Sequence, residues 1–178
     1  RKTKDNPLSP DGNLTTAEKK CILLNNIYGV DIDSQAVEVT KLNLLLKALE
    51  GETKASIDKQ LTFFNERVLP NLGDNIKCGN SLIGTDFYDE QPGLFTDNIK
   101  KINAFDWDKA FTEIFKNGGF DAVIGNPPWG ADFSEDELEY LRVKHRDIIV
   151  RMIDSFMYFI HRGSKLLNAG GNLGFIVP

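Results

Sequence analysis

Hydrophobic and polar positions follow two different periods along the chain. Apolar side chains spaced three and four residues apart predict helices, and short β-branched runs that end in polar residues predict buried strands. Helices are expected at about 15–25, 39–49, 56–68, 107–115, 134–145 and 149–167, and strands at 27–33, 76–80, 120–125 and 172–177. This alternation of helices and strands predicts an α/β fold with a mainly parallel sheet.

Local signals set the predicted ends of these elements. Thr15 with Glu18, and Ser134 with Glu137, have the spacing of capping boxes, so a helix should begin at each. Gly51 is expected to end the helix at 39–49, and the Gly170-Gly171 pair to turn the chain. Residues 1–14 are expected to be a mobile N-terminal end, and residues 84–105 a loop-rich insertion.

Length and composition narrow the classes of protein that fit. The chain has 178 residues, of which 41% are hydrophobic and 26% charged, which suits one folded domain. Its net charge of -5 makes it a poor nucleic-acid binder by itself, so if it acts on DNA or RNA, the basic surface is expected on parts outside the chain. No apolar run reaches membrane-spanning length. Because the sequence begins with Arg1 and ends in a strand-like run, we expect it to be an excerpt of a longer protein.

Cysteine and histidine are too scarce to suggest a metal site. Cys21 and Cys78 fit reduced thiols of a cytoplasmic protein, and no zinc-binding spacing occurs. His145 lies in a charged predicted helix, so solvent is its expected environment. His161 is expected to contact backbone or solvent. We therefore predict no metal centre.

Polar side chains mark the ends of the first three predicted strands. Ligands of parallel sheets bind at the carboxyl ends of strands, where Asp31, Asn80 and Asn126 lie. An acid at Asp31 suits the hydroxyl groups of a ribose, and Asn80 could bind an adenine edge. The alternatives are structural, because Asp33 is suited to capping a helix and Gly79-Asn80 has good turn chemistry.

The tetrapeptide Asn126-Pro127-Pro128-Trp129 carries the clearest chemistry. Asn126 offers a carbonyl acceptor, Pro127 offers a backbone carbonyl, and Pro128 stiffens the segment because both prolines fix their φ angles. Trp129 offers a flat aromatic face. Two acceptors beside such a face suit an exocyclic amine on a planar base. The alternative is a structural Pro-Pro turn with a core tryptophan.

Four sequence blocks together resemble S-adenosylmethionine-dependent DNA adenine-N6 methyltransferases of restriction–modification systems, above all the type IIG enzymes that fuse methylase and endonuclease. The blocks are NNIYGVDID (25–33), IKCGNSLIG (76–84), FDAVIGNPPW (120–129) and GGNLGFIVP (170–178). The resemblance covers nearly the whole chain. It implies that residues 1–178 form a partial catalytic domain, a Rossmann-like three-layer sandwich that lacks its first strand and its C-terminal strands. The target-recognition domain and any nuclease domain would lie elsewhere.

The resemblance also implies a role for each residue. Asp31 would bind the ribose of S-adenosylmethionine, Ile32 would pack on its adenine, and Asn80 would accept from the adenine amine where the family often has Asp. Asn126 and Pro127 would accept hydrogen bonds from the amine of a flipped adenine in double-stranded DNA, and Trp129 would stack on that base.

Two alternative functions remain open on the sequence. The same Asn-Pro-Pro-aromatic block serves enzymes that methylate RNA bases or a protein glutamine amide, although those chains are usually compact. A non-catalytic interaction module is the other alternative. The glycine-rich cofactor loop of the family is not in the chain, so we expect the fragment to be inactive by itself, with a second copy of the chain as a candidate to cover the gap.

Overall fold

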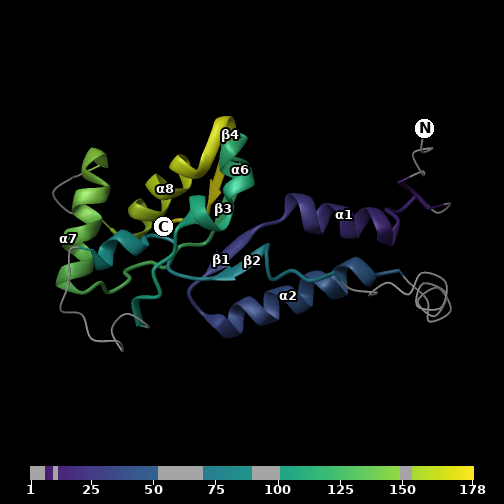
Figure 1. Cartoon of the computed structure of the whole chain (residues 1–178), viewed down its shortest axis with the longest axis horizontal. Helices are drawn as coiled ribbons and strands as arrows, with labels where there is room; N and C mark the ends of the chain where they lie inside the picture. Colours follow the sequence, from purple (N-terminus) through teal and green to yellow (C-terminus); the bar gives the residue numbers. More distant parts are fainter. Residues whose placement is uncertain (1–6, 10–11, 52–69, 90–100, 149–153) are drawn as a thin grey trace. The chain divides into compact units, whose positions relative to one another are not determined.

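The computed structural model describes residues 7–9, 12–51, 70–89, 101–148 and 154–178 (Figure 1). The chain divides into two compact units, Arg1–Cys78 and Gly79–Pro178. The helix predicted at 56–68 and the start of the helix predicted at 149–167 lie outside the described residues.

The described residues of the first unit include helices α1 and α2 and a two-stranded parallel sheet. Helix α1 begins at the predicted residue, because the Thr15 hydroxyl accepts a hydrogen bond from the Glu18 N–H at 3.3 Å. Strand β1 pairs with β2 from Gly29↔Ile76 to Asp31↔Cys78. The element bounds are α1 Thr16–Asn26, β1 Gly29–Asp31, α2 Ser34–Leu49 and β2 Ile76–Cys78.

A buried asparagine joins α1 to this sheet. The Asn75 side-chain amide donates to the carbonyls of Leu24 at 2.9 Å and Ile27 at 3.0 Å, where α1 ends. The Asn75 carbonyl accepts from the Gly29 N–H at 2.9 Å, the first residue of β1. These bonds satisfy carbonyls that a helix leaves unpaired at its end, and they fix the position from which β1 starts.

Helix α2 is apolar on two faces, and the structure buries one of them. Val37 and Ala48 are buried and pack with Leu23, Leu72 and Ile76, while Leu44 and Leu45 lie against the same cluster. Much of the apolar series from which the helix is predicted lies elsewhere, because Val39, Leu42 and Leu46 are each more than half exposed.

The second unit holds the other parallel pair, β3 and β4. Strand β3 has the predicted bounds, and it pairs with β4 from Phe120↔Leu167 to Gly125↔Phe175, with a shift of register between Phe120 and Ala122. The element bounds are η1 Thr85–Tyr88, α5 Trp107–Ala110, α6 Thr112–Lys116, β3 Phe120–Gly125, α7 Glu135–Lys144, η2 Arg146–Ile148, α8 Ser155–Leu166 and β4 Leu167–Phe175.

Two predictions for this unit are wrong in detail. The helix predicted at 107–115 is interrupted at Phe111, whose φ of -125° and ψ of 47° are not helical. The predicted turn at Gly170-Gly171 lies inside β4, which already begins at Leu167. Gly170 has a φ of +90°, a conformation that glycine adopts without strain, so the strand accommodates the shift of register there.

Helices α7 and α8 share one hydrophobic core. Ser134 and Glu137 form the predicted capping box at the start of α7, with the Glu137 carboxylate 2.8 Å from the Ser134 N–H. Among the described residues of this unit, one hydrophobic cluster consists of six buried side chains, which are Leu82, Ile83, Phe87, Tyr140, Leu141 and Tyr158. Because Tyr158 belongs to α8 and Tyr140 and Leu141 belong to α7, this cluster packs the two helices against each other.

The predicted α/β class with parallel strands is confirmed by these elements. Among the described residues the strands form two two-stranded sheets, and the three-layer sandwich and its truncation stay predictions. Within the described ranges, no helix has both the length and the apolar character needed to cross a membrane.

Candidate functional site

The predicted base-binding tetrapeptide follows directly on the carboxyl end of β3. Gly125 ends the strand, and the Phe175 ring packs so close that a Cβ at Gly125 would lie 3.0 Å from it. Asn126 is exposed and Pro127 is buried. The segment therefore leaves the sheet with one proline anchored and the asparagine side chain accessible to a ligand.

Trp129 is the exposed tip of this segment. Its side chain is 59% exposed, which excludes the core tryptophan that was the structural alternative. Gly130, the next residue, has a φ of +68°, and nothing lies within 4 Å of the position where a Cβ would be. The loop thus turns sharply beside an accessible aromatic face.

A serine of α8 forms hydrogen bonds with the backbone before and after Trp129. The Ser155 hydroxyl donates to the Pro128 carbonyl at 2.8 Å and accepts from the Ala131 N–H at 3.1 Å. Ser155 is 5% exposed. Ser155 cannot be identified from the sequence, because a single serine at the start of an apolar helix gives no signal of what it contacts.

The other predicted strand end, Asp31 with Ile32, belongs to the first unit. One oxygen of the exposed Asp31 carboxylate accepts from the Asp33 N–H at 2.8 Å. Asp33 in turn caps α2, accepting from the Gln35 N–H at 2.8 Å, as its structural alternative predicts. Ile32 is 56% exposed, and its carbonyl accepts from the Cys78 thiol at 3.4 Å.

This strand end offers a hydrogen-bond acceptor, Asp31, and an exposed apolar side chain, Ile32, which are the groups that a ribose and a purine would need. A carboxylate has about four acceptor positions, so the one bond to Asp33 leaves Asp31 able to accept from ribose hydroxyls. The exposed apolar side chain of Ile32 suits the flat face of a purine.

Asn80, in the second unit, uses its carbonyl oxygen for a turn. The Asn80 Oδ1 accepts from the Leu82 N–H at 3.0 Å and from the Ile83 N–H at 3.3 Å, and the residue is buried. An amide oxygen has two lone pairs, so the predicted acceptor role toward an adenine amine competes with these two bonds. The side-chain NH₂ group, a donor, is the part of Asn80 that suits a ring nitrogen.

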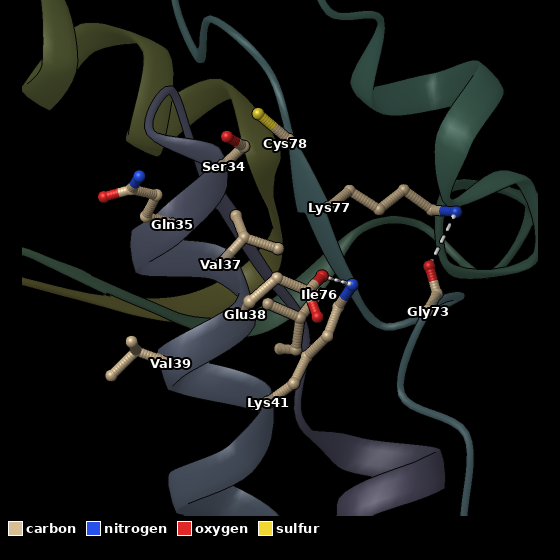
Figure 2. A pocket seen from close by; sticks show the side chains of 10 residues that line it. All are labelled: Ser34, Gln35, Val37, Glu38, Val39, Lys41, Gly73, Ile76, Lys77 and Cys78. Carbon is tan, nitrogen blue, oxygen red and sulfur yellow. Dashed lines mark hydrogen bonds and ion pairs between the residues drawn. The ribbon is translucent and has the colours of Figure 1, made fainter.

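A groove of about 690 Å³ runs between α2 and β2 in the first unit (Figure 2). Val37, Val39 and Ile76 form its apolar part, and Lys41 and Lys77 lie along it. Lys41 is paired with Glu38 at 2.8 Å, and Lys77 donates to the Gly73 carbonyl at 3.4 Å. None of the seven predicted site residues lines this groove.

The predicted surroundings of His145 and His161 are wrong, because the two rings contact each other in the second unit. His145 was expected in solvent, yet it is 3% exposed, and its Nδ1 lies 2.7 Å from the Nδ1 of His161. His145 follows α7 directly, and the chain places it against Tyr158 of α8. Burial lowers the pKa of His145 to about 4, and repulsion from Arg162, and from His161 when that ring is protonated, adds to this lowering of the pKa.

A tyrosine links the loop after Asn80 to α7. The Tyr140 hydroxyl donates to Asp86 at 2.6 Å and accepts from the Gly84 N–H at 3.0 Å, while Lys144 forms an ion pair with Asp86. Burial and the bond to Asp86 raise the pKa of Tyr140. Within the described ranges, no three His, Cys, Asp or Glu side chains gather as a possible metal site.

The chain is similar to restriction-modification methylases over most of its length. Residues 25–178 match the family model of the Eco57I restriction-modification methylase. The type II restriction enzyme and methyltransferase RM.Eco57I of Escherichia coli is 34% identical over 165 residues, covering 90% of the chain and 15% of the relative. A Methanocaldococcus jannaschii protein, RM.MjaORFECS2P, bears the provisional name of a type II restriction enzyme and methyltransferase. It is 26% identical over 273 residues, covering 90% of the chain and 22% of the relative.

The chain spans less than a quarter of the length of these two curated relatives. No solved structure matches it.

Proposed function

Because the chain belongs to the Eco57I restriction-modification methylase family, we propose that it forms part of the catalytic core of a DNA methyltransferase. The resemblance found in the sequence is thereby confirmed at the level of the family. We further propose that the methyl group comes from S-adenosyl-L-methionine and goes to N6 of adenine in double-stranded DNA. The observation that carries this proposal is the exposed Trp129 on a braced loop next to Asn126.

The tetrapeptide would bind an adenine turned out of the duplex. Stacking of a base on an aromatic side chain is worth about 1–3 kcal/mol, which offsets part of the cost of unstacking it from DNA. The accessible face of Trp129 suits this role. The Asn126 Oδ1 and the Pro127 carbonyl would then accept the two hydrogens of the N6 amine.

These two acceptors would also activate the amine. Its lone pair is delocalised into the adenine ring, which makes the nitrogen a weak nucleophile. Two hydrogen bonds out of the ring plane draw the nitrogen toward tetrahedral geometry and localise the lone pair. S-adenosylmethionine, when bound, supplies an electrophilic methyl group. The methylated amine is strongly acidic and can release its proton to water, so catalysis would rest on positioning and fixed dipoles.

Asp31 and Ile32 would hold the nucleoside part of the cofactor. The Asp31 carboxylate would accept from the ribose hydroxyls, and Ile32 would cover one face of the adenine. We propose that Asn80 contributes through its NH₂ group, since its oxygen already accepts two backbone N–H groups. Double-stranded DNA would be held mainly by other parts of the protein, since this chain carries a net charge of -5. A cytoplasmic location follows from a DNA substrate and is part of the proposal.

The test uses the whole reading frame that encodes this chain. It is expressed in a host that lacks DNA adenine methylation, beside Asn126→Ala and the control Asn117→Ala. Asn117 is also an exposed asparagine, but it precedes β3 and bonds to the Glu113 carbonyl. N6-methyladenine is then quantified in digested genomic DNA. We expect a clear rise for the wild type and Asn117→Ala, and a fall of about 10²–10³ in rate for Asn126→Ala.

Equal methylation by Asn126→Ala and wild type would contradict the mechanism. No N6-methyladenine from a stable wild-type protein would overturn the DNA adenine substrate. The same extracts are then analysed for methylated RNA bases and for methylglutamine. If none of the three assays detects a methylated product, the result would support a non-catalytic interaction module.

A further inference from the structure

Ser155 bonds to the backbone on both sides of Trp129 in the sequence. Its hydroxyl has one hydrogen to donate and two lone pairs to accept with, so it can bind the Pro128 carbonyl and the Ala131 N–H at once. The Asp154 carboxylate lies farther from the hydroxyl, at 3.3 Å, than the Pro128 carbonyl does at 2.8 Å. The two shorter contacts join α8 to the residues on both sides of the tryptophan.

The backbone is therefore the part of the loop that sets the position of the indole. Trp129 is 59% exposed, so most of its surface is not packed against protein atoms. The backbone on both sides is restrained instead: Pro127, two residues before the tryptophan, is buried, and the N–H of Ala131, two residues after it, donates to Ser155. If the two hydrogen bonds to Ser155 are lost, the tip gains conformational freedom that a base would have to remove on binding.

We propose that Ser155 is a positioning residue for the methyl transfer and acts through Trp129. It holds the indole where a flipped base can stack with its amine against Asn126. This role rests on the proposed function. Ser155 does not contact the reacting atoms, and its effect depends on the presence of the aromatic face that it orients.

The kinetic test is a double-mutant cycle on the whole reading frame. The variants are Ser155→Ala, Trp129→Ala and the double variant, with Ser164→Ala as the matched control. Ser164 is a serine of the same helix, and its hydroxyl bonds to the His161 carbonyl one turn away. The probe is genomic DNA from a methylation-deficient strain with radiolabelled S-adenosylmethionine, under single-turnover conditions.

We expect Ser155→Ala to lower the single-turnover rate by about 10- to 100-fold. Ser164→Ala should have no effect, and Ser155→Thr, which keeps the hydroxyl, should recover part of the rate. DNA affinity, measured by fluorescence anisotropy, should be unchanged by Ser155→Ala. In the Trp129→Ala background, adding Ser155→Ala should lower the single-turnover rate little further, because the side chain through which Ser155 acts is gone.

A second measurement separates positioning from loss of folding. The protein is labelled with 5-fluorotryptophan, and ¹⁹F spectra are recorded, in which Trp107 reports on the aromatic cluster it forms with Phe105 and Phe111. Ser155→Ala should move or broaden the Trp129 signal and leave the Trp107 signal in place. If the Trp107 signal also moves, Ser155→Cys, which keeps the volume and weakens both hydrogen bonds, is used instead.

The outcomes distinguish the two proposals. If the wild-type protein transfers no label, the proposed function is wrong and the role of Ser155 fails with it. If the wild type transfers label but the Ser155 and Trp129 losses simply add, the proposed function stands and the positioning role is overturned. An unchanged Trp129 signal in the serine variant would overturn the role in the same way.

Discussion

Acid should destabilise the fold through the buried His145–His161 pair. The two Nδ1 atoms are 2.7 Å apart, so one ring must donate and the other must accept. When both rings are protonated, both Nδ1 atoms carry hydrogens and the bond is lost. A single added proton already places a charge on a ring pair in which His145 is 3% exposed and faces Arg162 and Lys165.

The magnitude follows from the pKa of His145. Burial lowers this pKa from the ordinary 6.5 to about 4 in the folded chain. The unfolded chain therefore binds a proton more readily, and stability that is complete above pH 6.5 is lost as the pH falls toward 4. At pH 5 the loss from this residue is about 2 kcal/mol in the free energy of unfolding.

The assay compares urea unfolding, followed by tryptophan fluorescence, at pH 7.5 and pH 5.0. Carboxylates also titrate in this interval, so the wild type is measured beside His145→Asn, whose amide can bond to His161 without titrating. We expect the wild type to lose about 2 kcal/mol more than the variant between the two pH values. Equal losses in both proteins would refute the reasoning.

Two further predictions concern local structure in the second unit. Tyr140→Phe leaves the Gly84 N–H without its partner and removes a bond to Asp86, so urea unfolding at pH 7.5 should show a loss of about 1.5–3 kcal/mol. Gly119→Ala forces a side chain onto a φ of +112°, and its Cβ would lie 2.7 Å from a backbone oxygen. It should cost clearly more in the free energy of unfolding than Gly170→Ala, whose φ of +90° carries only about 1–2 kcal/mol of strain in open space. Equal midpoints for the two glycine variants would contradict this.

The features that the sequence predicts well are those decided by neighbouring residues. Helices α1 and α7 begin where Thr15 and Ser134 can cap them, because the capped N–H group lies three residues on. Strand β3 has its predicted bounds because glycine precedes and ends an apolar run. The tetrapeptide after β3 is recognisable for the same reason, since its two prolines and its tryptophan act over four consecutive positions.

The features that the sequence does not predict depend on distant contacts. Helix α2 has apolar residues around most of its circumference, so the pattern identifies a helix but not which face is buried. The choice of Val37 and Ala48 over Val39 and Leu42 is made by α1 and β2. His145 is likewise placed by α8. These contacts join residues that no local periodicity relates.

The turn that Asn80 forms limits the hydrogen bonds that its side chain can still offer to a ligand. The resemblance to methyltransferases implies an acceptor at this position, where the family often has Asp. A carboxylate could accept from the two backbone N–H groups of the turn and still accept from an adenine amine, because it has about four acceptor positions. The amide oxygen of Asn80 has two, and Leu82 and Ile83 occupy them. The amide also has an NH₂ group that can donate. Asn80, which stands where the family often has Asp, is therefore better suited to bind a ring nitrogen of an adenine than its exocyclic amine.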